Sequence, residues 1–165
     1  MQFFAIVVLC VLAAVTYGIV HDQVTVRVCI EYFTIGHPPV FATNSPTLLA
    51  LGWGIIATWW VGLPLGIVLA AAARVGSRPK LTACNVLRPL GFLLLAMALL
   101  ALAAGVLGWV LASRGSVALP EPLFSRVPAE AHVGFLADAF AHLTSYVVGA
   151  VGGLVLSVWA WRRRS

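Results

Sequence analysis

Histidine and carboxylate side chains, which can serve as acids, bases or metal ligands, gather toward the two ends of this sequence. His21 and Asp22 are adjacent and directly follow a long apolar run, and Asp138 and His142 lie four residues apart. On a helix, that second spacing places both side chains on one face. A carboxylate beside a histidine raises the basicity of the ring and fixes its tautomer, as general bases and metal ligands require. The structural alternative is a polar helix cap at a membrane interface, and we favour it.

Two or three of the histidines together with a carboxylate could bind zinc, copper or iron. The candidate metal ligands are His21, His37, His132, His142 and Asp138. No two histidines are four residues apart, and the sequence contains no HExxH signature. We therefore expect an interfacial polar cluster, with a bound transition metal as the alternative and no other cofactor indicated. The members of this cluster are His21, Asp22, Glu31, His37, Asp138 and His142.

The composition indicates which solvent surrounds these polar residues. Hydrophobic residues make up 62% of the 165-residue chain and charged residues only 9%, with a mean hydropathy of +1.04. In soluble domains about a quarter of the residues are charged, so this chain is expected to fold in the lipid bilayer. The net charge of +5 does not indicate nucleic-acid binding, because the basic residues are not interleaved with aromatic ones as in RNA-binding surfaces.

The apolar runs predict an all-α membrane protein, a bundle of four transmembrane helices in a single domain covering residues 1–165. The expected helices cover about 3–20, 46–73, 89–112 and 129–161. Ser45 and Pro46 are a typical N-cap and first helical residue, and Pro64, between two glycines, predicts a kink in the second helix. A cleaved signal peptide is the alternative for the first run, although no Lys or Arg precedes it.

A polar loop over residues 21–45 is expected to separate the first two helices. Within it, Val24, Val26, Val28 and Ile30 alternate with polar residues. This period of two predicts a short strand, which would need a partner such as residues 116–119. The alternative is an interfacial helix that extends the first one. Gly36, Pro38 and Pro39 end either element.

The distribution of charge predicts the orientation. The loop at 74–88 and the C-terminal tail hold seven basic residues and no acid, whereas all five acids and all four histidines lie on the other side. By the positive-inside rule, both termini are cytoplasmic in a multi-pass protein of the cytoplasmic (inner) membrane. The polar residues of the first and fourth helices then meet one surface at similar depth. An unpaired charge at an apolar boundary costs free energy, so the two polar pairs should be partners. We therefore expect His21 or Asp22 within hydrogen-bond or single-water reach of Asp138 or His142.

Small residues recur every four positions along the last predicted helix. Ala137, Ala141, Ser145, Gly149, Gly153 and Ser157 form this stripe. Small side chains at this spacing let another helix approach closely. The stripe therefore predicts close packing, either inside the bundle or against a second copy or another membrane protein through Ser145, Gly149, Gly153 and Ser157.

The segment after the first run has recognisable motifs. It contains His21-Asp22-Gln23, then Glu31-Tyr32-Phe33-Thr34, then Gly36-His37-Pro38, with Trp53-Gly54 and ATWWVG at 57–62 further on. By these motifs, roughly the first 65 residues resemble a group of bacterial inner-membrane proteins of unknown function. The resemblance implies that the loop and the second helix act as one unit, and it implies no activity.

Two hypotheses of function follow from these patterns. The first is a non-enzymatic accessory or assembly protein whose outer polar loops meet a partner, since no complete catalytic signature is present. The alternative is a small membrane enzyme or metal carrier that uses the outer cluster of histidines and acids. A transporter is a weaker third hypothesis, because no charged residue is expected in the middle of the membrane.

Overall fold

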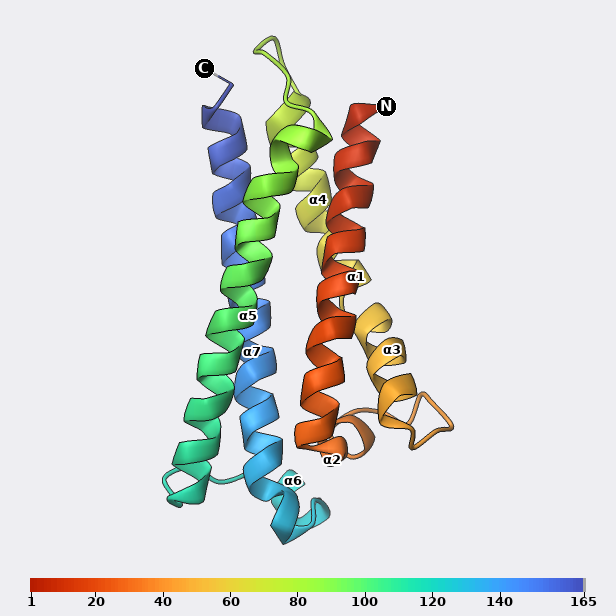
Figure 1. Ribbon diagram of the computed structural model, residues 1–165, viewed down its shortest axis with the longest axis vertical. Coiled ribbons are helices and arrows are strands. Elements are labelled where there is room, and N and C mark those ends of the chain that lie inside the picture. Colours follow the sequence, from red (N-terminus) through yellow and green to blue (C-terminus); the bar gives the residue numbers. More distant parts are fainter. Residues whose placement is uncertain (165) are drawn as a thin grey trace.

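The computed structural model describes residues 1–164, which form an elongated bundle of helices (Figure 1). Four helical segments are long and apolar enough to cross a membrane: Gln2–Val28, Pro46–Arg74, Ala83–Ser113 and Ala129–Arg162. Both chain ends and the turn between the second and third segments lie at one end of the bundle (Figure 1). The prediction of an all-α protein with four candidate membrane spans is confirmed.

The first helix, α1 (Gln2–Val28), is longer than predicted, and the predicted strand over residues 24–30 is wrong. Gly18, Asp22, Thr25 and Val26 are buried along α1, at the spacing of one helical face. The alternating valines therefore lie on a helix whose burial follows a period of 3.6. Cys29 is extended and separates α1 from the short α2 (Ile30–Thr34). The described residues contain no strand, so residues 116–119 form no strand pair with residues 24–30.

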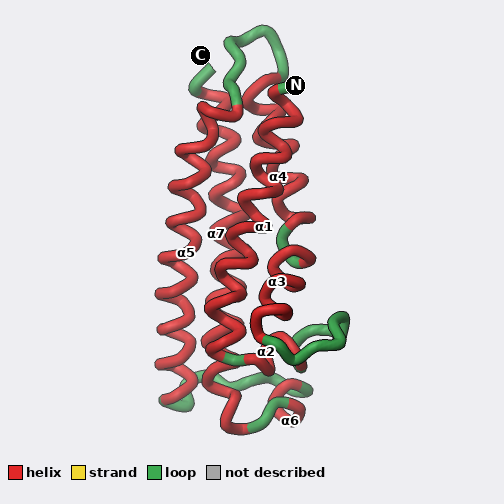
Figure 2. Tube along the Cα trace, turned by 45° about the vertical axis from the view of Figure 1, so that its right-hand side comes forward, coloured by secondary structure: helices red, strands yellow, loops and turns green. Residues whose placement is uncertain are grey.

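The second span is broken in two, but not at the proline. Helix α3 (Pro46–Ile56) ends at Ala57, and α4 (Trp59–Arg74) begins after Thr58, whereas Pro64 lies inside α4. Figure 2 shows the break as a short loop between the two helices. The Thr58 hydroxyl donates to the Gly54 carbonyl, a back-bond that competes with regular helix geometry. The break thus lies nearly two turns before Pro64, the residue at which the sequence predicts a kink.

Close to the break, the backbones of α3 and α1 approach each other at Gly54 and Gly18. A Cβ atom at Gly54 would lie 2.5 Å from the Ile19 backbone nitrogen, and one at Gly18 would lie 2.6 Å from the Gly54 carbonyl oxygen. Only glycine permits this approach of two backbones. The contact fixes α3 against the half of α1 that holds His21 and Asp22.

The last two spans form an antiparallel pair. Helix α5 (Ala83–Ser113) begins six residues before the predicted start, because Thr82 and Asn85 form a capping box. A short α6 (Leu123–Arg126) and a 3-10 turn η1 (Ala129–Ala131) precede α7 (His132–Arg162). The small-residue stripe of α7 is buried within the chain, where Gly149 faces Met97 of α5 and Gly153 faces Leu65 of α4.

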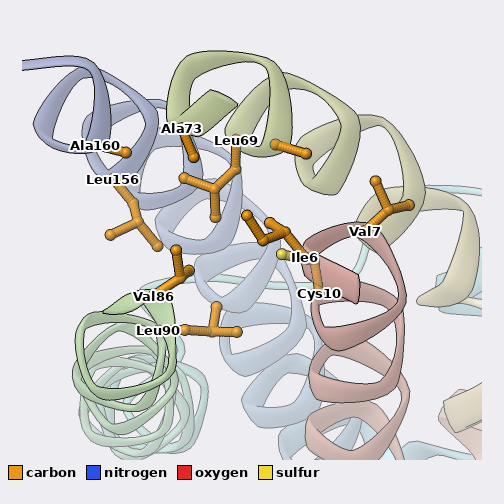
Figure 3. Close-up of a cluster of buried hydrophobic side chains, with 10 residues drawn as sticks. Ile6, Val7, Cys10, Leu69, Ala73, Val86, Leu90, Leu156 and Ala160 are labelled. Carbon is orange, nitrogen blue, oxygen red and sulfur yellow. The ribbon is translucent and has the colours of Figure 1, made fainter. Parts of the chain in front are cut away.

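Apolar side chains from four helices close the bundle near the termini. Ile6 and Cys10 of α1, Leu69 of α4, Leu90 of α5 and Leu156 of α7 point toward one another (Figure 3). The buried polar residues of this half are Ser157 and Arg164, which bond to backbone carbonyls. The acids and histidines of the described chain lie toward the opposite half.

Candidate metal centre

Asp22 on α1 and His142 on α7 form the centre of the polar cluster. Both side chains are buried, and Asp22 Oδ1 lies 3.3 Å from His142 Nε2. The predicted proximity of the first and last spans is confirmed by this contact. Asp22 lies on the buried face of α1, together with Gly18. His142 lies on the buried face of α7, together with Asp138, and the contact of these two faces brings Asp22 and His142 together.

The hydrogen bonds of His142 determine where its protons lie. Its Nδ1 is 2.9 Å from the backbone carbonyl oxygen of Asp138, which can only accept, so Nδ1 carries a hydrogen. In the neutral ring, Nε2 then presents a lone pair toward the Asp22 carboxylate. Two acceptors do not attract each other, so a cation must lie between them, either a proton or a metal ion.

The role predicted for the Asp138 side chain is wrong in one respect. Its carboxylate does not orient His142; the Asp138 backbone carbonyl does. Asp138 is almost fully buried, and its Oδ2 has no hydrogen-bond partner among the described residues. The carboxylate that meets the histidine ring comes from Asp22.

His21 completes a group of three candidate ligands. One ligand atom each from His21, Asp22 and His142 lie within 4.8 Å of one another. The two imidazole rings have centroids 4.6 Å apart, and His21 Nε2 is buried with no partner in residues 1–164. A buried ring nitrogen without a partner is costly, and a metal ion would satisfy it.

An aromatic wall covers the outer side of this group. Tyr32 of α2 lies over His142 at 4.5 Å between ring centroids, and His37 packs on Trp53 of α3 at 4.6 Å. His37 Nδ1 donates to the Tyr32 carbonyl oxygen at 2.8 Å. Burial lowers the pKa of His37, so its ring stays neutral at neutral pH. His37 thus supports the wall and is not one of the three grouped ligands.

The remaining predicted residues lie elsewhere. His132 Nε2 is 2.9 Å from the Val127 carbonyl oxygen, and its ring packs on Phe124 at the start of α7. Glu31 accepts a hydrogen bond from the Cys29 thiol at 3.4 Å. Burial raises the pKa of Cys29 to about 12, so this thiol is protonated and is a poor metal ligand. Neither His132 nor Glu31 joins the group of three.

A cavity of about 130 Å³ runs from the site into the bundle. Its polar end is lined by Tyr17, His21, Asp22 and His142, and its floor by Cys10 and Leu156. The Tyr17 hydroxyl and Ser145 Oγ are 2.7 Å apart at the wall. Sequence reasoning missed Tyr17, although it lies four residues before His21 and hence on the same helical face.

Known proteins offer no guide to this site. Comparison with protein-family models, curated proteins and solved structures finds no match to the chain. The resemblance noted from the motifs at 21–38 and 53–62 therefore stays a prediction.

Proposed function

We propose that this chain is a multi-pass membrane protein that holds one transition-metal ion through His21, Asp22 and His142. The observation that carries this proposal is the arrangement of acceptors around one point. The lone pair of His142 Nε2 faces the Asp22 carboxylate at 3.3 Å, and a ring nitrogen of His21 lies within 4.8 Å of a ligand atom of each. His21 Nε2 has no partner within residues 1–164.

A shared proton satisfies this geometry less well than a metal ion. A proton between Asp22 and His142 would resolve their contact, but it would leave His21 Nε2 buried and unsatisfied. A divalent ion accepts electron pairs from all three groups at once. A metal-bound histidine usually donates its other ring N–H to a carbonyl or carboxylate oxygen, as His142 Nδ1 does to the Asp138 carbonyl.

The donor set indicates the class of metal. Two imidazole nitrogens and one carboxylate oxygen suit zinc, iron or copper, and three protein ligands leave at least one position open. The cavity beside the group supplies space for a water molecule or substrate at that position. Such a centre fits a small membrane enzyme or a metal carrier.

We propose the cytoplasmic membrane as the location, with both termini on the cytoplasmic side. Support comes from the charges at the end of the bundle that carries both termini (Figure 1). The loop at 74–88 and the tail hold seven basic residues and no acid. The resemblance to bacterial inner-membrane proteins points to the same membrane. The metal centre then lies near the outer surface.

A non-enzymatic accessory or assembly role is the second candidate. Val40 and Phe124, in the loops at the end opposite the termini, expose about half of their side-chain surface. A partner outside the membrane spans would contact apolar side chains of this kind. In that case the polar cluster would only hold the bundle together, and it would bind no metal.

Metal content separates the two candidates. Purified protein is incubated with zinc, desalted and analysed for elemental content, and we expect about one zinc per chain. His21→Ala and His142→Ala should lose it, whereas His132→Ala, a matched control outside the group, should retain it. Wild-type protein without zinc, or equal loss in the control, would contradict the metal centre and leave the accessory role.

A further inference from the structure

A groove between α1 and α5 opens on the side of the bundle away from α3 and α4. Its volume is about 490 Å³, in the range of small-molecule sites. Val20, Val24 and Val28 of α1 form one wall, and Leu102, Val106 and Trp109 of α5 form the other. Ala137, Asp138 and Ala141 of α7 form the floor. Tyr17, His21 and Thr25 of α1 also line the groove, which is otherwise apolar except at Asp138.

Asp138 is the unusual residue of this floor. Its side chain is only 1% exposed, and its Oδ2 has no hydrogen-bond partner in the described part of the chain. The metal group does not use this carboxylate, because only the Asp138 backbone contacts His142. A buried carboxylate oxygen in apolar surroundings requires a donor, and the groove is the space that can supply one.

We propose that the groove binds one lipid of the adjacent leaflet, whose uncharged head group donates a hydroxyl hydrogen bond to Asp138 Oδ2. This binding does not rest on the proposed metal ion. The groove shares Tyr17 and His21 with the cavity beside the metal group, but the proposed acceptor, Asp138, lines only the groove.

The extent of the groove favours a lipid over a partner helix. Its α1 wall runs from Tyr17 to Val28, which is about 17 Å along a helix axis. That is roughly half of a hydrocarbon core about 30 Å thick, and it matches one leaflet. The Ala83 N–H donates to the Gln2 side chain at 3.1 Å near the termini, and α1 and α5 diverge toward the other end (Figure 1). A flexible acyl chain fits this tapered space. A straight transmembrane helix would need a groove that extends across the whole hydrocarbon core.

The charges of the groove select the head group. Of the described residues that line it, none is Lys or Arg, so nothing there would hold a phosphate or fatty-acid carboxylate. The donor must also reach Asp138, two turns inside the first residues of α7. The ammonium of a zwitterionic phospholipid lies beyond its phosphate, in the aqueous head-group layer. A hydroxyl attached directly to the lipid backbone lies at the required depth, as in a diacylglycerol.

Two probes and two variants test this assignment by native mass spectrometry of the full chain in detergent. The probes are dioleoylglycerol and its acetate ester, in which the hydroxyl is capped. Val24→Trp fills the groove from α1. Val8→Trp is the matched control, because Val8 is similarly exposed on the same helix and does not line the groove.

We expect wild-type protein and Val8→Trp to carry one dioleoylglycerol, with affinity about tenfold or more above that for the acetate. Val24→Trp should lose both lipids. Asp138→Leu, if it folds, should bind the two probes equally. Equal binding of both probes to wild type, or undiminished binding to Val24→Trp, would overturn the assignment. Zinc content of the same samples separates the two sites, since Val24→Trp should keep its zinc.

Discussion

The Asp22 carboxylate and the His142 imidazole lie 3.3 Å apart, although 120 positions separate them in the chain. Asp22 belongs to the first candidate span and His142 to the last, so their contact links these two spans. Both side chains are buried. The pair should therefore contribute to stability even without a metal ion.

A double-mutant cycle measures that contribution. With Asp22→Ala, His142→Ala and the double variant in the presence of chelator, we expect a coupling free energy of about 0.5–3 kcal/mol. The physical reason is that each single variant leaves one buried polar group unpaired, whereas the double variant leaves neither. Thermal or chemical unfolding in detergent gives the values. Additive losses would show that the two side chains do not interact in the folded protein.

The contact between Gly18 and Gly54 predicts a steep cost for one added methyl group. In Gly54→Ala the new Cβ would meet the Ile19 backbone, which cannot rotate away, so we expect a loss of about 1–3 kcal/mol. Gly91→Ala is the control, since nothing lies within 4 Å of its Cβ position. Alanine there should be neutral or stabilising by up to about 1 kcal/mol. If both variants melt alike, α1 and α3 do not approach as described.

His37 predicts a stability that depends on pH. Burial lowers its pKa below the ordinary value of 6.5. As the pH falls below 6.5, the unfolded chain binds a proton at this ring before the folded chain does. Folding stability should therefore decrease from about pH 6.5 down to the lowered pKa and then level off. In His37→Phe, melting temperatures between pH 7.5 and 5 should lack this part of the decrease; an unchanged profile would contradict a neutral, buried His37.

The orientation can be tested with cysteine labelling. In a Cys84→Ser background, which removes the exposed native thiol, Ile35→Cys and Pro120→Cys should react with an impermeant reagent in intact cells. Both positions lie in loops at the end opposite the termini. Labelling at both positions only after permeabilisation would reverse the proposed topology, because these loops would then face the cytoplasm.

The sequence predicts the spans well because hydropathy over 20 residues depends on the bilayer and not on tertiary packing. It also predicts the approach of Asp22 and His142, since two polar pairs at one depth of an apolar medium are cheaper together than apart. The strand over 24–30 failed because a run of seven residues can match two periods. Val26 and Thr25 are buried by neighbouring helices, and that burial selects the helical period.

Other features depend on contacts that no local pattern reveals. The break at Ala57 and Thr58 follows from the approach of Gly54 to α1, whereas Pro64 fits within α4. The predicted side-chain pairing of Asp138 with His142 assumed that neighbours on a face must bond. In the folded chain the Asp22 carboxylate contacts the ring, and Asp138 lines the groove beside α5.

The most direct test of the metal centre is X-ray absorption at the zinc edge on protein loaded with one zinc. We expect only nitrogen and oxygen neighbours at about 2.0–2.2 Å, with histidine scattering from two imidazoles. A sulfur neighbour at about 2.3 Å would place the zinc on a cysteine, and a spectrum without histidine scattering would place it away from His21 and His142. Either result would contradict a centre formed by His21, Asp22 and His142.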